Sequence, residues 1–184
     1  MRKLIVSEFL SVDGVIEAPE TWHFPFVNDE VQAEINAGIH ATDALLLGRV
    51  TYEAFAPFWP SQANNEHGIA DHLNKIPKYV VSTTLRSATW SPSTLISANI
   101  VAEITHLKQQ SGGNIGVTGS ATLVQSLMGA NLIDEYQIFI HPVVVGHGKK
   151  LFNTMDKSTA LKLVSSRIFS TGVALMTYQP VSAS

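Results

Sequence analysis

The chain has no cysteine among its 184 residues. It therefore cannot form a disulfide, use a thiol as a nucleophile or bind a metal ion through thiolates. Charged residues are also few, at 15% of the chain, whereas hydrophobic residues make up 45%. This composition excludes an intrinsically disordered protein and predicts a compact domain with a substantial core.

Neither sign of charge dominates the sequence, and it has no long apolar run. The formal net charge is −3 and the basic residues are scattered, so we expect no nucleic-acid partner and no membrane partner. No stretch approaches the roughly 18 apolar residues of a membrane-spanning helix. The N-terminal stretch MRKLIVSEFLSVDG is interrupted by Glu8 and has no small-residue cleavage site. It therefore predicts a first strand rather than a signal peptide, and we expect a cytoplasmic protein.

Strand-like and helix-like segments alternate along the chain. The predicted strands are residues 4–10, 44–47, 79–81, 115–118, 133–140, 161–170 and 173–178, the last two joined by a tight turn. The predicted helices are residues 28–39, one or two turns at 49–56, residues 99–110 and a helix capped by Ser120, with a loop at 57–67. Such alternation is typical of an α/β fold with a mixed, mainly parallel sheet flanked by helices, and the last two strands add an antiparallel hairpin. We expect one domain over residues 1–180 and a tail at 181–184.

Polar residues follow three of the predicted strands. The three sets are Gly48, Arg49 and Thr51; Ser82 and Thr83; and Gly119, Ser120, Ala121 and Thr122. Ligands bind beyond the carboxyl ends of strands in open sheets, a helix start attracts phosphate, and an arginine offers a planar charged fork to phosphate oxygens. The first and third sets lie at helix starts and would hold a pyrophosphate. The second set would then hold a phosphate on a ribose, so that the three sets together would bind a dinucleotide.

Each set also has a simpler interpretation, which the sequence leaves open. Gly48 would only make a turn, with Arg49 paired to a surface carboxylate. Ser120 would only cap a helix after a glycine turn, and Ser82 would belong to an ordinary polar strand end.

The order of the motifs resembles the dihydrofolate reductase-like superfamily. The resemblance rests on SVDGVI, LLLGRVTYEAF, YVVST, IGVTGSATLVQSLMGANLIDEYQIFIHPVVVGHGKKLF and the C-terminal hairpin, and it covers roughly residues 2–179. Within the superfamily, the chain is most similar to the C-terminal reductase domain of the bifunctional riboflavin-biosynthesis deaminase–reductase and to its stand-alone relatives. The resemblance implies an eight-stranded, mainly parallel sheet and NADPH as cofactor. The deaminase half carries a His/Cys zinc signature, and because this chain has no cysteine we expect it to lack that activity.

The resemblance also implies roles for the three sets. Gly48, Arg49 and Thr51 would lie at the phosphates, Ser82 and Thr83 at the adenosine ribose and its 2′-phosphate, and Gly119, Ser120, Ala121 and Thr122 at the pyrophosphate. Asp13, Gly14, Val15 and Ile16 would form a mobile loop over the nicotinamide. Dihydrofolate reductases have two glycines joined by a cis peptide where this chain has Gly119-Ser120, so persistence of the cis peptide is open.

The substrate side is less defined. Dihydrofolate reductases bind the pterin with one helix carboxylate, for which Asp29, Glu30 and Glu34 are candidates here unless all three are solvated. Asp13, Glu30 or Glu34, or a water molecule, would donate the proton. The aromatic residues Trp22, Phe24, Phe26, Phe58 and Trp59 would stack on a planar heterocycle or belong to the core. His141 and His147 lack metal-ligand spacing, so we expect no metal site.

The leading hypothesis is an NADPH-dependent reductase of a small heterocyclic substrate, similar to the 5-amino-6-(5-phosphoribosylamino)uracil reductase of riboflavin biosynthesis. The alternatives are dihydrofolate reduction, a nucleotide-binding module without turnover, and a structural or interaction domain. The apolar final strand VALMTY is compatible with a homodimer, because an uncovered apolar edge favours association. A monomer whose edge is covered by a loop is the other possibility.

Overall fold

The computed structural model describes residues 1–62, 69–152 and 158–181. Its strands form one eight-stranded sheet in the order β4-β3-β2-β5-β1-β6-β8-β7. They are β1 (Leu4–Ser11), β2 (Thr42–Gly48), β3 (Lys78–Val81), β4 (Ser93–Ile96), β5 (Asn114–Val117), β6 (Glu135–His141), β7 (Leu161–Ile168) and β8 (Ala174–Pro180). The pairs among β1 to β6 are parallel, whereas β8 is antiparallel to both β6 and β7. This confirms the predicted mixed, mainly parallel sheet with a C-terminal hairpin.

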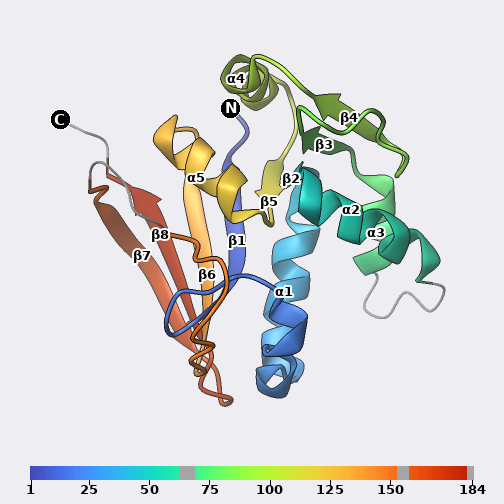
Figure 1. Cartoon of the computed structure of the whole chain (residues 1–184). Helices are drawn as coiled ribbons and strands as arrows, with labels where there is room; N and C mark the ends of the chain where they lie inside the picture. The colour runs from blue at the N-terminus through green and yellow to red at the C-terminus, as the bar shows by residue number, and fades with distance from the viewer. Residues whose placement is uncertain (63–68, 153–157, 182–184) are drawn as a thin grey trace.

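Helices cover both faces of the sheet. They are α1 (Asp29–His40), α2 (Arg49–Phe58), α3 (Ile69–Lys75), α4 (Ile100–Gln109) and α5 (Ala121–Gly129), with short 3-10 helices at Pro19–Thr21, Phe24–Phe26 and Trp59–Ser61. The helices α4 and α5 lie on one face, and α1, α2 and α3 lie on the other (Figure 1). Alternate residues of the central strand β1 point to opposite faces, so Val6 packs with α4 and α5 while Phe9 packs with α1.

Two helices begin where the capping residues predict. The side chain of Asn28 accepts a hydrogen bond from the Val31 N–H at 3.1 Å at the start of α1. The Ser120 hydroxyl accepts one from the Leu123 N–H at 3.4 Å at the start of α5. Each cap satisfies a backbone donor that has no partner inside its helix. Both helix starts are therefore stabilised by their own capping residue.

The segment after β2 differs from the prediction. The helix α2 continues through Pro57 to Phe58 instead of ending in a loop at 57, and α3, which periodicity missed, follows at 69–75. Ile69 and Leu73 pack against the core formed by β2, β3 and Trp90, so burial rather than intrinsic propensity accounts for this short helix. The predicted loop positions 63–67 lie outside the described residues.

The C-terminal hairpin corrects one expectation. The strand that contains ALMTY, β8, lies between β6 and β7, so it is not an uncovered edge. The edge strand at this end of the sheet is β7, which ends at Ile168 rather than 170 because the chain turns at Gly172, whose φ is 86°. Leu163, Val164 and Ile168 of β7 are exposed. The homodimer stays a prediction. The uncovered apolar edge that would favour association is β7 rather than β8. Residues 182–184 of the predicted tail lie outside the described residues.

Candidate functional site at the carboxyl edge of the sheet

The end of β2 and the loop that follows β5 meet at the carboxyl edge of the sheet. The Gly48 N–H donates a hydrogen bond to the Gly119 carbonyl at 3.4 Å. A Cβ on Gly48 would lie 2.7 Å from the Ser120 hydroxyl oxygen, and a Cβ on Gly119 would overlap the Thr51 hydroxyl oxygen. A side chain at either position would separate the end of β2 from the loop that follows β5. The two glycines therefore allow the N-termini of α2 and α5 to lie side by side.

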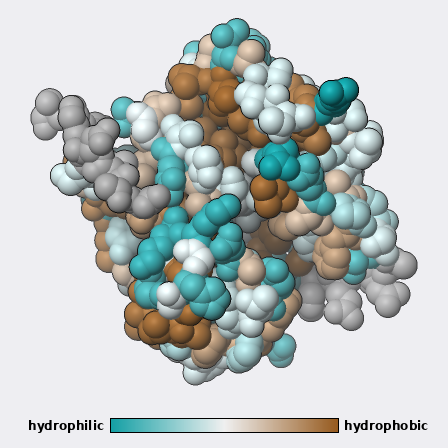
Figure 2. Space-filling model, in the orientation of Figure 1, coloured by the Kyte–Doolittle hydropathy of each residue, from teal (hydrophilic) through white to brown (hydrophobic). Residues whose placement is uncertain are grey.

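We call this feature the cradle and define it as Gly48, Arg49, Thr51 and residues 119–122. The peptide between Gly119 and Ser120 is cis, which answers the question that the sequence left open. In the space-filling view, the surface is hollowed where α5, β5 and α2 face one another, and apolar residues form the floor of the hollow (Figure 2). Two helix starts beside a hollow are suited to bind an anion, because the first N–H groups of a helix have no intrahelical acceptor.

The side chains of the cradle differ in what they offer. Arg49 forms an ion pair with Glu53 at 2.7 Å, and its side chain is 44% exposed. This is the simpler interpretation of Arg49 in the free chain, but an exposed pair of this kind contributes only about 0–1 kcal/mol, so an anion can replace Glu53. Thr122 is exposed and Thr51 is half-buried, whereas Ala121 is buried and offers only its backbone.

The third predicted set lies beyond β3. The Ser82 hydroxyl accepts hydrogen bonds from the N–H groups of Thr84 (3.1 Å) and Leu85 (2.9 Å). It therefore stabilises the strand end, in agreement with the simpler interpretation. Thr83 is exposed and follows β3, the sheet neighbour of β2. Of this set, Thr83 has the side chain that a ligand can reach.

The loop after β1 is held by the segment that follows β6. Asp13 accepts hydrogen bonds from the Ser11 hydroxyl at 2.7 Å and from the N–H groups of Val145 and Gly146 at 3.0 and 2.9 Å. The Ser11 hydroxyl and these amides lower the pKa of Asp13 to about 2. A carboxylate that stays ionised at neutral pH is poorly suited to donate a proton, so the structure gives the predicted catalytic role of Asp13 no support.

The predicted nicotinamide loop has fixed partners as well. Val15 is 1% exposed and pairs with Lys150 in an isolated antiparallel bridge. The Ile16 N–H donates to the Lys149 carbonyl at 2.9 Å, and Ile16 packs against the main core. Both residues therefore position the loop beside the end of β1. Their contact with a nicotinamide stays a prediction.

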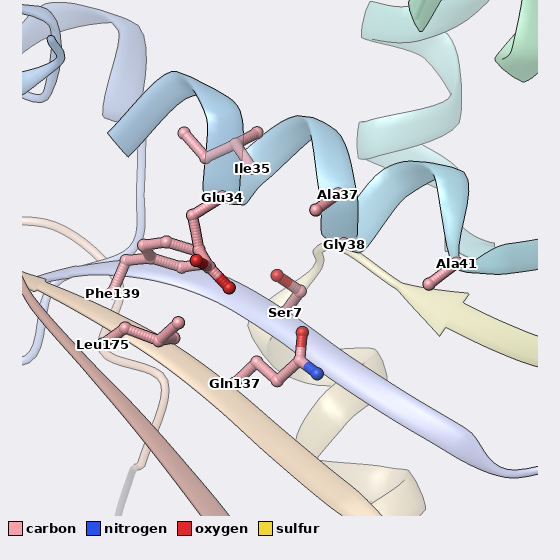
Figure 3. Close-up of a pocket in the computed structure, with 9 residues that line it drawn as sticks. All are labelled: Ser7, Glu34, Ile35, Ala37, Gly38, Ala41, Gln137, Phe139 and Leu175. Atoms are coloured by element: carbon pink, nitrogen blue, oxygen red, sulfur yellow. The ribbon is translucent and has the colours of Figure 1, made fainter. Parts of the chain in front are cut away.

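A cavity of about 230 Å³ lies between α1 and the sheet. Its lining residues are Ser7, Glu34, Ile35, Ala37, Gly38, Ala41, Gln137, Phe139 and Leu175. Figure 3 shows the carboxylate of Glu34 pointing from α1 toward the strands, with the Ser7 hydroxyl and the Gln137 amide beside it. Phe139 and Leu175 form an apolar wall. Three polar side chains that converge beside an apolar wall are typical of a small-molecule site.

The structure separates the helix carboxylates that the sequence left equivalent. Glu34 lines the cavity and forms an ion pair with Arg167 of β7 at 2.7 Å. Glu30 instead accepts hydrogen bonds from the Ser170 N–H at 3.3 Å and hydroxyl at 3.0 Å, and both lower its pKa. Asp29 is exposed. Glu34 is thus the candidate that faces a cavity.

The candidate aromatic residues do not line this cavity. Trp22 and Phe26 pack edge-on against the buried His141, and His23 lies in the same cluster. Burial lowers the pKa of His23 to about 4 and also lowers that of His141, so both rings are neutral. Phe24 is exposed. Trp22 and Phe26 therefore belong to a packed aromatic cluster, in agreement with the alternative that they are core residues.

The other two aromatic candidates lie on α2 and just after it. Phe58 and Trp59 pack against each other with ring centroids 5.0 Å apart. Phe58 is half exposed, and Trp59 packs against the core between the sheet and α3. Neither lines the cavity beside α1.

One residue beside the cradle was missed by the sequence analysis. Glu8 on β1 is 7% exposed, and its Oε1 accepts the N–H of Gly119 at 2.5 Å. Burial raises its pKa to about 8, with the Gly119 amide acting in the opposite direction. The feature of the sequence that could have identified Glu8 is that it is the single charged residue of an otherwise uncharged strand, LIVSEFLS.

Comparisons with known proteins give a consistent assignment. The model of the RibD C-terminal domain matches residues 2–175. Two Bacillus subtilis (strain 168) proteins are similar over nearly their whole length. YyaP is 28% identical over 179 residues (96% of this chain, 94% of YyaP), and YwjB is 31% identical over 181 residues (95% and 96%).

Solved structures share the fold. A putative riboflavin biosynthesis protein from Shewanella sp. PV-4 superposes with a TM-score of 0.80 at 21% identity, covering 97% of this chain and 99% of that one. The diaminohydroxyphosphoribosylaminopyrimidine deaminase/5-amino-6-(5-phosphoribosylamino)uracil reductase from Thermotoga maritima gives 0.70 at 12% identity. That match covers 98% of this chain and 57% of the bifunctional one. Among the described residues, no helix is both long and apolar enough to span a membrane. The chain belongs to the RibD C-terminal domain family, a family of reductase domains, and it has the dihydrofolate reductase-like fold.

Proposed function

We propose that the protein is an NADPH-dependent reductase of a small heterocyclic compound, similar to 5-amino-6-(5-phosphoribosylamino)uracil reductase. One observation carries the proposal: Gly48 and Gly119 bring the N-termini of α2 and α5 together at the carboxyl edge of the sheet. The family assignment supports a reductase. The identity of the cofactor, the identity of the substrate and the residues that contact them are our proposals.

The cradle fits a dinucleotide diphosphate in shape and charge. The absence of a Cβ at positions 48 and 119 leaves backbone N–H groups of two helix starts near one place. The Arg49 guanidinium and the hydroxyls of Thr51 and Thr122 add charge-assisted and neutral hydrogen bonds. Thr83, which follows β3, would contact the 2′-phosphate of the dinucleotide. Bound NADPH would supply the hydride, and the chain would bind, orient and exclude water.

The cavity beside α1 is the proposed substrate site. Its acceptor groups are the Glu34 carboxylate, the Ser7 hydroxyl and the Gln137 amide oxygen. Carboxylate and carbonyl oxygens accept hydrogen bonds from ring N–H and amino groups, so the cavity favours an aminopyrimidine or a related ring. Ser7 precedes Glu8 on β1, and Glu8 contacts the cradle. The substrate cavity and the cofactor cradle therefore share the strand β1, with Ser7 and Glu8 pointing to opposite faces of the sheet.

The experiment that tests the proposal measures NADPH oxidation against phosphorylated and free aminopyrimidines and against pterins. We expect turnover of an aminopyrimidine and its loss in Glu34→Gln, which removes the cavity carboxylate. Glu30→Gln is the matched control, because Glu30 lies on the same helix and is bonded to the hairpin turn. Turnover of dihydrofolate alone would favour the pterin alternative. Tight NADPH binding without turnover of any compound would contradict the reductase and favour a nucleotide-binding module.

A further inference from the structure

Glu8 connects the sheet interior to the cradle. Its carboxylate accepts the Gly119 N–H at 2.5 Å, and the Gly119 carbonyl accepts the Gly48 N–H at 3.4 Å. A short chain of hydrogen bonds thus runs from Glu8 through both halves of the cradle. Any change in the charge of Glu8 acts directly on the amide that positions the start of α5.

The surroundings of Glu8 are apolar. Val6 and Leu10 flank it on the same face of β1, and Ile138 is its partner on β6; all three belong to the main core. A carboxylate in such a place loses most of its hydration, and burial raises the pKa of Glu8 to about 8. The group is therefore mostly protonated at neutral pH and ionises in a mildly alkaline solution.

The strands and helix that pack against Glu8 offer it no counter-charge. The sequences of β5 (NIGV) and α5 (ATLVQSLMG) contain no ionisable residue. Tyr136 of β6 shares the face of Glu8, and burial raises its pKa to about 12, so it is neutral. Glu135 and His141 of β6 occupy the alternate register and point to the opposite face.

The remaining charged groups on this side are exposed or already paired. Arg49 at the start of α2 pairs with Glu53, and Lys108 of α4 pairs with Asp134. The other ionisable residues of α4, of residues 12–18 and of residues 142–150 are Glu103, His106, Asp13, Glu17, His147, Lys149 and Lys150. The pKa of Glu8 has two causes, burial and the Gly119 amide, and no ionisable residue is among them.

We propose that Glu8 couples the binding of a diphosphate at the cradle to the uptake of one proton, acting through the Gly119 amide as a positioning residue. The inference rests on the proposed function, because the dinucleotide supplies the diphosphate. A diphosphate brings at least two negative charges beside a carboxyl group in a medium of low dielectric constant, which disfavours the carboxylate. At a pH above the pKa of Glu8 in the free protein, Glu8 is therefore ionised in the free protein and protonated in the complex.

Linkage gives the direction of the pH dependence. The protein with protonated Glu8 binds the diphosphate more tightly, so the Kd for NADPH should be constant below about pH 8 and rise above it. The rise approaches tenfold per pH unit, since one proton is taken up for each diphosphate bound. The 2′-phosphate does not interfere, because its second pKa of about 6 leaves it fully ionised in this range.

The test is calorimetric titration of the whole protein with NADPH between pH 7 and 9.5, in two buffers of different ionisation enthalpy. We expect uptake of about half a proton per NADPH near pH 8. Glu8→Gln keeps an oxygen for the Gly119 N–H but cannot titrate, so it should take up no proton and bind with a Kd that is independent of pH. Glu103→Gln, on the exposed side of α4, is the control and should behave like the unmodified protein.

The outcomes separate this inference from the proposed function. Binding of NADPH without proton uptake, or with equal uptake by Glu8→Gln, overturns the coupling and leaves the reductase proposal standing. No binding of NADPH at any pH overturns both. Should Glu8→Gln fail to fold, the amide resonance of Gly119 in the unmodified protein decides. Its titration midpoint near pH 8 must move upward with saturating NADPH, and an unmoved midpoint overturns the coupling.

Discussion

Gly48→Ala is the substitution that tests the packing of the cradle most sharply. Gly48 has φ −74° and ψ 158°, which an alanine adopts without strain, so the effect isolates the added methyl group. That methyl would lie 2.7 Å from the Ser120 hydroxyl oxygen and 3.3 Å from the Ser120 backbone nitrogen. The hydroxyl can rotate away, but the backbone cannot, so the start of α5 must shift.

Overpacking of this kind costs about 1–3 kcal/mol, and we expect Gly48→Ala to lower the free energy of unfolding by that amount. For a chain of this length the melting temperature should fall by about 2–4 °C for each kcal/mol. The assay is urea denaturation followed by tryptophan fluorescence and circular dichroism, with the NADPH Kd measured in parallel. NADPH should bind more weakly as well, because the two helix starts no longer align.

Gly129→Ala is the matched control at the other end of α5. A Cβ there has no heavy atom within 4 Å, and alanine is favoured over glycine in a helix by up to about 1 kcal/mol. The control should therefore not lose stability. An unfolding midpoint of Gly48→Ala equal to that of the unmodified protein would refute the close contact between the end of β2 and the loop before α5.

Three further substitutions address the ligand sites and the aromatic cluster. Arg49→Ala should weaken NADPH binding by about 1–3 kcal/mol, the scale of lost charge-assisted hydrogen bonds, in a fluorescence titration; unchanged affinity would remove Arg49 from the site. Glu34→Gln should abolish turnover in the NADPH oxidation assay while leaving the Kd for NADPH within twofold, and equal loss of both would place Glu34 in a structural role. His23 has a pKa below its unfolded value, so the unfolded state binds more protons between about pH 6.5 and 4, and stability should fall as the pH falls through that window. His23→Gln should flatten part of this fall in urea denaturation, with the remainder left to His141; an unchanged pH profile would contradict the burial of a neutral His23.

The sheet was predictable because strand periodicity is local. Apolar runs at 44–47 and 115–118 correspond to buried central strands, and the caps Asn28 and Ser120 correspond to real helix starts. The helix α3 was not predictable in this way, because its seven residues are stabilised by burial of Ile69 and Leu73 against distant strands. The position of β8 inside the sheet depends equally on long-range pairing with β6.

The candidate site was predictable in its outline and not in its details. The sequence indicated that residues 48–51 and 119–122 meet, because both follow parallel strands of one sheet. It left Glu30 and Glu34 equivalent, since the choice depends on how α1 is rotated against β6 and β8. Glu8 was missed because a charged residue in a strand is usually exposed, and its burial shows only when β1 is placed in the sheet centre.

The most direct test of the account is a crystal structure of the protein with NADPH. We predict electron density for the diphosphate against the start of α5, with the Arg49 guanidinium turned from Glu53 to a phosphate oxygen and the nicotinamide directed toward the end of β1. A dinucleotide bound elsewhere on the molecule, or a cradle that excludes it at saturating concentration, would contradict the account.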